Sequence, residues 1–180
     1  MDVVTNIQFK IGDKLVDYGQ VHRVFKIQRG VTFNSAKVDY IYYRPYFKKG
    51  KDSTLSCRIP MQSIGETKLR RPVTKDKMKL VLALLEQMPE IDVSMNVIEA
   101  SACFKENNLE ETARLLRLLW VEKQDPEKKL TVRKKMIFED ALRHIAEEMA
   151  VVYDMDLEKA VRKVLSCLRK MCPEKKSGEE

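Results

Sequence analysis

The spacing of apolar residues changes at Pro72, and this change limits the possible folds more than any other feature. Before it, apolar and polar residues alternate from Leu55 to Ile59, which is the period of a half-buried strand. After it, apolar residues from Leu109 to Trp120 return at spacings of 4, 3 and 4, which is the period of an amphipathic helix. We therefore expect an α+β chain in which a small β-domain over 1–72 precedes a helical domain.

The part before Pro72 contains several short strand-like stretches. Their bounds are Phe9–Val16 with a Gly-Asp turn inside it, Val21–Ile27, Val38–Tyr43 and Leu55–Ile59. Polar turns join them, and residues 48–53 have the composition of an exposed hairpin loop. Short strands linked by polar turns predict a small barrel or sandwich.

The part after Pro72 predicts a five-helix bundle over 73–172 and a disordered polar tail over 173–180. Four polar residues stand where helices would begin, namely Thr74, Asn108, Thr131 and Asp156. Asn108 followed by Glu111 has the pattern of a capping box. The predicted inward residues are Met78, Val81, Leu82 and Leu85; Val93, Val97, Ala100 and Phe104; Leu109, Ala113, Leu116 and Trp120; Phe138, Leu142, Ile145, Met149 and Val152; and Leu157, Val161, Val164, Leu168 and Met171.

The cysteines and the apolar runs favour a cytoplasmic protein. Cys57, Cys103, Cys167 and Cys172 form no CxxC pair, so we expect reduced thiols and no metal site. The N-terminus lacks the apolar segment of a secretory signal. Apolar runs fall short of the ~20 residues that a membrane span requires. We therefore expect no membrane association.

The basic charge is concentrated in the first part of the chain. Residues 1–72 contain 14 Lys and Arg against 6 Asp and Glu, a net charge of +8, whereas residues 73–180 contain 20 against 21. Such a domain attracts nucleic acid or an acidic protein surface, although solubility alone also explains a basic excess.

Several segments together resemble the CarD family and the polymerase-interacting domain of the transcription–repair coupling factor. The matching segments are Phe9–Val16, Arg58–Pro60, Ile64–Gly65, Leu69–Val73, Leu115–Trp120, Leu130–Thr131 and Lys134–Met136. The resemblance implies a Tudor/SH3-like β-barrel that binds the RNA polymerase β subunit by adding a strand edge to it. It also implies that the helical domain modulates promoter complexes near upstream DNA.

The resemblance further implies which residues act. Arg58 and Arg29 match polymerase-contacting positions of the family, and the alternative for Arg58 is a solvated strand residue. The family's DNA-wedging tryptophan falls on Val93 here, and the basic pair after it falls near Met95 and Asn96, so the wedge is absent or replaced.

Basic and aromatic clusters have more than one interpretation. Lys68, Arg70 and Arg71 either contact DNA phosphates weakly and without sequence preference, or form a solvated linker. The basic residues between 128 and 135 are a second candidate for phosphate contact, or they form an exposed first helical turn.

The aromatic residues also have two interpretations. Tyr40, Tyr42, Tyr43 and Tyr46 with Arg44 and Lys48 could form a nucleic-acid platform, but we favour structural roles for the tyrosines, with Tyr43 or Tyr46 exposed. Trp120 lies on an apolar stripe, which favours the core over base stacking.

Catalysis has little support in the sequence. His22 and His144 have no nucleophile at motif spacing, and we expect His144 at the surface or its boundary. The pairs Glu110–Glu111 and Glu147–Glu148 are explained by solvated helix faces. We therefore expect no enzymatic activity, cofactor, metal or small-molecule substrate, and the family resemblance implies a transcription regulator. The alternatives are a stand-alone nucleic-acid-binding barrel with an oligomerising bundle, and a scaffold that binds another protein.

Overall fold

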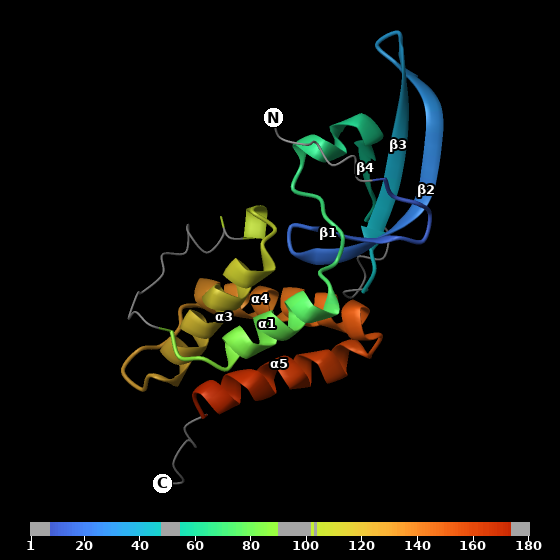
Figure 1. The fold of residues 1–180 in the computed structure, drawn as a ribbon. Coiled ribbons are helices and arrows are strands. Elements are labelled where there is room, and N and C mark those ends of the chain that lie inside the picture. Colours follow the sequence, from blue (N-terminus) through green and yellow to red (C-terminus); the bar gives the residue numbers. More distant parts are fainter. Residues whose placement is uncertain (1–7, 48–54, 90–101, 103, 174–180) are drawn as a thin grey trace, which may run out of the picture. The chain divides into compact units, whose positions relative to one another are not determined.

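The computed structural model describes residues 8–47, 55–89, 102 and 104–173 (Figure 1). The chain divides into two compact units, residues 1–72 and 73–180. The first contains a curled antiparallel sheet and the second contains helices, so the α+β class is confirmed. No helix within the described ranges combines the length and the apolarity needed to cross a membrane.

The first unit is a four-stranded antiparallel sheet in the order β1-β2-β3-β4. Its strands are β1 (Lys14–Asp17), β2 (Gln20–Phe33), β3 (Ala36–Pro45) and β4 (Cys57–Pro60), and the 3-10 helix η1 (Met61–Glu66) follows β4. The chain then returns to β1, where Val16 N–H donates to the Arg70 carbonyl at 2.8 Å and Arg70 N–H donates back at 3.3 Å.

The strands differ in length from the predicted ones. The segment expected to begin at Phe9 forms a turn first, with Gly12 at a φ of +96°, and becomes a strand only at Lys14. β2 is longer than predicted because it runs past Gly30 as one arm of a long hairpin with β3. The predicted 48–53 loop lies outside the described residues.

The core of the first unit lies against one face of this sheet. Its buried members come from β1, β2, β3, η1 and the segments before β1 and after η1: Phe9, Leu15, Val24, Ile41, Tyr43, Ile64 and Leu69. Tyr43 also donates its hydroxyl to Asp17 Oδ2 at 2.9 Å. Burial, reinforced by the Asp17 carboxylate, raises the pKa of Tyr43. The phenol therefore stays protonated as a hydrogen-bond donor.

The second unit contains α1 (Lys75–Leu85), α3 (Leu109–Gln124), α4 (Val132–Tyr153) and α5 (Leu157–Met171). The four predicted starts are confirmed as N-cap positions. Most of the predicted helix over 93–104 lies outside the described residues. At the inward positions that are described, every side chain is buried or half-buried. The half-buried ones are Leu82, Phe104, Leu142, Val152, Leu157, Val161 and Met171.

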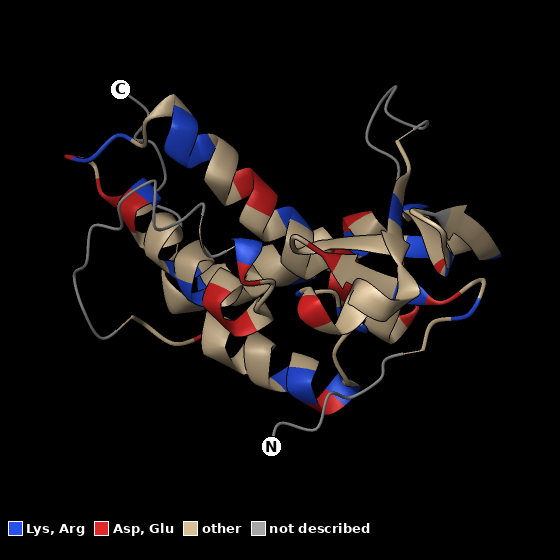
Figure 2. Cartoon of the chain, turned by 90° about the horizontal axis from the view of Figure 1, so that it is seen from above, with Lys and Arg blue, Asp and Glu red and all other residues tan. Residues whose placement is uncertain are grey.

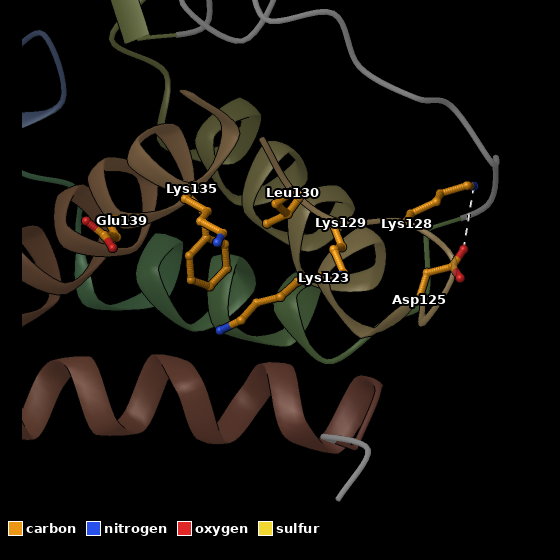
Figure 3. A pocket seen from close by; sticks show the side chains of 8 residues that line it. Lys123, Asp125, Lys128, Lys129, Leu130, Lys135 and Glu139 are labelled. Carbon is orange, nitrogen blue, oxygen red and sulfur yellow. Dashed lines mark ion pairs between the residues drawn. The ribbon is translucent and has the colours of Figure 1, made fainter. Parts of the chain in front are cut away.

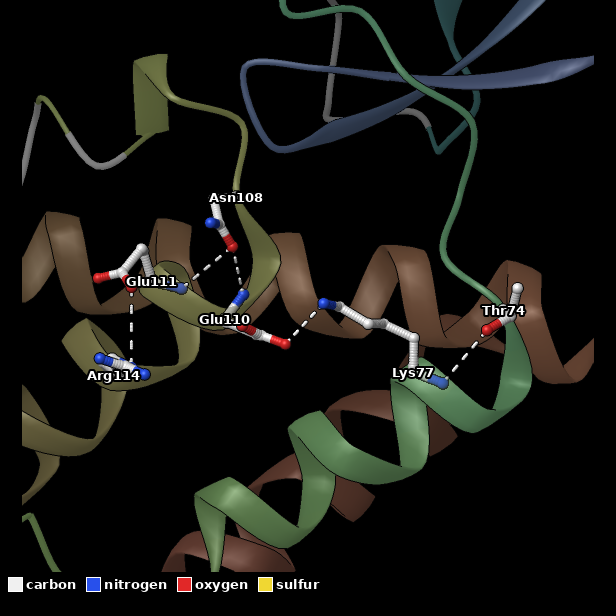
Figure 4. Close-up of polar contacts among 6 residues, drawn as sticks. All are labelled: Thr74, Lys77, Asn108, Glu110, Glu111 and Arg114. Carbon is white, nitrogen blue, oxygen red and sulfur yellow. Dashed lines mark hydrogen bonds and ion pairs between the residues drawn. The ribbon is translucent and has the colours of Figure 1, made fainter.

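The caps show why the helices begin where they do (Figure 4). Thr74 Oγ1 accepts a hydrogen bond from Lys77 N–H at 3.2 Å, and Asn108 Oδ1 accepts one from Glu110 N–H at 3.0 Å. These bonds satisfy amide groups that have no partner within the helix. Lys77 Nζ also lies 2.7 Å from Glu110 Oε1, an ion pair that joins α1 to α3.

Trp120 belongs to the core of the second unit, as predicted. Its side chain is 1% exposed and is stacked on Phe138, with the ring centroids 6.1 Å apart. The indole N–H donates to the Cys172 carbonyl at 2.9 Å, which satisfies its polar atom.

Three polar residues of α4 are buried, contrary to prediction. His144 is 5% exposed, with its ring 4.8 Å from that of Phe104, and Glu147 and Glu148 are 3% and 0% exposed. Glu147 accepts from Arg143 Nε and Glu148 accepts from Val73 N–H, each at 2.7 Å. The prediction was wrong because α4 packs against α1, α3 and α5, and from Asp140 to Tyr153 it has no exposed side chain.

Candidate interaction face on the β-sheet

Strand register gathers basic side chains on the sheet face opposite the core. Ile41 and Tyr43 point into the core, so Tyr42 and Arg44 lie on the other side. Residues directly opposite on neighbouring strands share a face. The pairings Lys26–Tyr42–Arg58 and Lys14–Arg23–Arg44 therefore form two rows across the sheet. We call the set of Lys14, Arg23, Phe25, Lys26, Tyr42, Arg44 and Arg58 the basic face.

A β-bulge determines the composition of the basic face. The pairing of β2 with β3 slips by one residue between Val24 and Lys26, which leaves Phe25 as the extra residue. Its ring lies 5.2 Å from the Arg44 guanidinium and 6.3 Å from the Tyr42 ring. Both Phe25 and Lys26 therefore lie on the outer side, which regular alternation would forbid.

Cations lie over the aromatic rings of this side of the sheet. Lys26 Nζ is 5.1 Å from the Tyr42 ring centroid, and the Arg58 guanidinium is 5.6 Å from that of Tyr40. The Tyr42 hydroxyl donates to Gln28 Oε1 at 3.0 Å. Each such cation–π contact contributes about 0.5–1 kcal/mol at exposed sites. The rings thus hold the cations in place, and Tyr40 itself is only 8% exposed.

The charged side chains of the basic face all have the same sign. Figure 2 colours the Lys and Arg positions of the chain blue and the Asp and Glu positions red. The basic face contains five Lys and Arg side chains and no carboxylate. Four of the five cations are exposed, and Lys14 is half-buried with its Nζ 4.9 Å from the Tyr46 ring centroid. Like charges held this close create a positive potential that an acidic surface would neutralise.

The structure separates the two arginines that were predicted to act together. Arg58 is exposed in β4, in register with Tyr42. Arg29 is also exposed, but it lies in β2 beside Gly30, within a second register irregularity, and is not paired with either Tyr42 or Arg58. Gly30 has a φ of +65° and donates its N–H to Asp39 Oδ1 at 2.8 Å.

The predicted DNA-contacting cluster is partly engaged within the first unit. Arg71 Nη2 donates to the Gln8 carbonyl at 2.7 Å and lies 3.1 Å from Asp13 Oδ2. Its guanidinium is also 5.1 Å from the Phe9 ring centroid. Arg70 donates to the Arg71 carbonyl, and Lys68 is exposed. Arg71 therefore holds the segment before β1 in place.

Sequence reasoning missed four of the seven residues of the basic face. It considered Tyr42, Arg44 and Arg58 in separate contexts but gave no role to Lys14, Arg23, Phe25 and Lys26. Alternation along β2 alone gave no reason to group Phe25 with Lys26. Of the two tyrosines whose exposure was considered, Tyr43 is buried and Tyr46 is 40% exposed.

Burial shifts the pKa values of two titratable side chains in the first unit, His22 and Cys57. Burial lowers the pKa of His22, whose Nδ1 lies 3.0 Å from the Gln20 carbonyl. Burial and then Asp17 raise the pKa of the Cys57 thiol, which weakens it as a nucleophile. In the described part of the chain, His, Cys, Asp and Glu side chains form no group of three that would hold a metal ion.

The expected wedge position Val93 and the following Met95 and Asn96 lie outside the described residues. Comparison with models of known protein families and with curated proteins gives no match to this chain.

Proposed function

We propose that the chain is a CarD-like transcription regulator whose first unit, a small Tudor-like barrel, binds the RNA polymerase β subunit. The observation that carries this proposal is the position of Arg58 on the edge strand β4, within a face of five cations of which four are exposed. The family resemblance assigns a polymerase contact to that same arginine. The 3-10 helix after β4 and the return of Arg70 to β1 support the barrel description, since they bring the end of the unit back to its first strand.

The mode of binding combines a strand edge with a basic surface. Among the described strands, β4 is paired on its β3 side only, so its other edge is available to a partner strand. The basic face beside it attracts carboxylates and orients the partner. The helical unit then modulates promoter complexes near upstream DNA, without the tryptophan wedge of the family.

The aromatic rings argue for an acidic protein partner over direct base stacking. A stacking platform needs open ring faces. Here Lys26 covers one face of Tyr42, and Tyr40 is buried under Arg58. A stand-alone nucleic-acid-binding barrel remains the competing function, and its support is the charge of the face alone.

The test is binding of the full chain to RNA polymerase and to the isolated lobe of the β subunit, measured by biolayer interferometry. We expect Arg58→Glu to weaken both interactions at least tenfold, about 1.4 kcal/mol, because an interfacial cation becomes an anion facing acidic groups. Lys37→Glu is the matched control, since Lys37 is exposed on β3 of the same unit and its substitution changes the net charge equally.

Two results would contradict the proposal. One is a folded chain that binds neither polymerase nor the β lobe. The other is equal loss of binding in Arg58→Glu and Lys37→Glu, which would reduce the effect to net charge. Salt-sensitive binding to DNA in the absence of polymerase binding would instead favour the stand-alone nucleic-acid function.

A further inference from the structure

A pocket of about 380 Å³ lies in the second unit, where α3 ends and α4 begins (Figure 3). Its volume is within the range of sites for small molecules, which is about 300–1,000 Å³. Leu130 and Phe138 contribute apolar surface to its lining, and each is less than a tenth exposed. The pocket belongs to neither the basic face nor the β-sheet.

Lysines dominate the polar lining of this pocket. Lys123, Lys128, Lys129 and Lys135 line it together with only two carboxylates, Asp125 and Glu139, so the lining carries a net charge of +2. One of those carboxylates is already engaged, because Lys128 Nζ lies 3.7 Å from Asp125 Oδ2. In Figure 3, Lys123 and Lys135 extend toward the same space, whereas Glu139 and the Lys128–Asp125 pair lie toward its ends.

The lysine nearest the aromatic core is held in position. Lys123 Nζ is 5.4 Å from the Trp120 ring centroid and 5.1 Å from that of Phe138. Contact with two aromatic rings restricts the movement of the ammonium group. A positioned cation beside a buried aromatic side chain suits a ligand that has both an anionic group and an apolar body.

The start of α4 adds an electrostatic reason for an anion. The first turns of α1, α3 and α5 each contain an acidic residue, which complements the positive end of the helix dipole. The first turn of α4 contains none, and Lys135 follows directly in the pocket lining. A bound anion would offset both the dipole and the repulsion among the lysines.

From this geometry we infer a binding site for a small organic anion, with a carboxylate or phosphate group held by Lys123 and Lys135 and an apolar ring or short chain against Leu130 and Phe138. A nucleic-acid backbone would reach the lysines but leave the apolar lining unused. The inference does not depend on polymerase binding by the first unit.

The experiment titrates the full chain with phenyl phosphate, benzoate and inorganic phosphate. Trp120 is the single tryptophan of the chain and touches the pocket through Lys123 and Phe138, so its fluorescence reports binding, with calorimetry as the second measurement. We expect at least one aromatic anion to bind at least tenfold more tightly than inorganic phosphate. Lys135→Gln should weaken that binding about tenfold, since it removes a charged partner.

Lys159→Gln is the matched control, because Lys159 is exposed on α5 and its substitution removes the same charge outside the pocket lining. It should leave binding unchanged. Equal binding of phenyl phosphate, benzoate and inorganic phosphate would overturn the inference, as would equal effects of the two substitutions. A loss of duplex DNA binding in Lys135→Gln, with aromatic anions not bound by the wild-type chain, would reassign these lysines to phosphate-backbone contacts.

Discussion

His22 shows how a single residue links the fold of the first unit to pH. It is 5% exposed, and its ring is 5.4 Å from that of Tyr43 in an edge-to-face arrangement. Burial lowers its pKa below the ordinary value of 6.5, while the Gln20 carbonyl and Asp17 oppose this shift in part. The folded chain therefore favours neutral imidazole at this position.

We predict that the first unit loses stability as the pH falls below about 6.5. Between 6.5 and the lowered pKa, the unfolded chain binds more protons at His22 than the folded chain, so unfolding becomes more favourable. Five of the six tyrosines lie in residues 1–72, so tyrosine near-ultraviolet circular dichroism during urea unfolding follows this unit.

His22→Gln provides the comparison for this prediction. Glutamine does not titrate, and its amide supplies a donor of similar reach for the Gln20 carbonyl. The variant should show a smaller change of unfolding midpoint between pH 7.5 and pH 5.5 than the wild-type chain. Identical changes in both proteins would show that His22 does not carry the effect.

The helices of the second unit differ in how their first turns are capped. Asn108 and Asp156 both occupy N-cap positions, but the Asn108 side chain accepts bonds from Glu110 and Glu111 N–H. Among the described residues, the Asp156 side chain makes no cap hydrogen bond. The two residue types are almost equally favoured at this position, so their contrast isolates the contribution of the bond itself.

We predict that Asn108→Ala lowers the free energy of unfolding by about 1 kcal/mol, because it leaves amide groups of α3 without an acceptor. Asp156→Ala should cost less, about 0.3–0.5 kcal/mol, through the loss of charge near the helix dipole alone. Urea unfolding followed by Trp120 fluorescence measures both. A larger loss in Asp156→Ala would contradict the assigned caps.

The elements that could be predicted are those that local chemistry determines. Thr74, Asn108 and Thr131 cap helices because their side chains bond to amides two or three residues away. Partners this close along the chain can be recognised from the sequence alone. The alternation of apolar and polar residues along the strands was recognised for the same reason, because it also relates residues that are close in the sequence. The burial of His144 and Glu148 was missed because it depends on which helices surround α4, and residue spacing within one helix contains no such information.

The candidate site was predictable only in part, for a related reason. Arg58 was found from a motif and from its alternation with Cys57 and Ile59. The grouping of Arg58 with Lys26 depends on the pairing of three strands and on the bulge at Phe25. Because a one-residue slip changes the face of every following side chain, such a grouping needs the register itself.

At the scale of the whole molecule, the two parts of the chain carry very different charge. Residues 1–72 have a net charge of +8, and residues 73–180 have a net charge of −1. If the first unit binds an acidic protein surface, its long-range attraction will depend on the salt concentration, since the Debye length falls from about 10 Å at 0.1 M to about 3 Å at 1 M.

We predict that the association rate with the β lobe falls at least about tenfold between 50 mM and 500 mM salt, whereas the dissociation rate changes much less, because steering acts before contact. Interferometry at a series of salt concentrations measures both rates. An association rate independent of salt would indicate that the charge of the first unit plays no part in recognition.

The edge strand β4 ends at Pro60, and this bears on self-association. Proline has no backbone N–H, and β4 has only four residues, so a second sheet finds few donors and acceptors to extend along. Pairing of β4 edges between copies of the chain, which could lead to fibrils, is therefore weak even at high concentration. A strand of four residues also forms too few backbone hydrogen bonds to distinguish one extended peptide from another. A natural partner must therefore be selected through side-chain contacts.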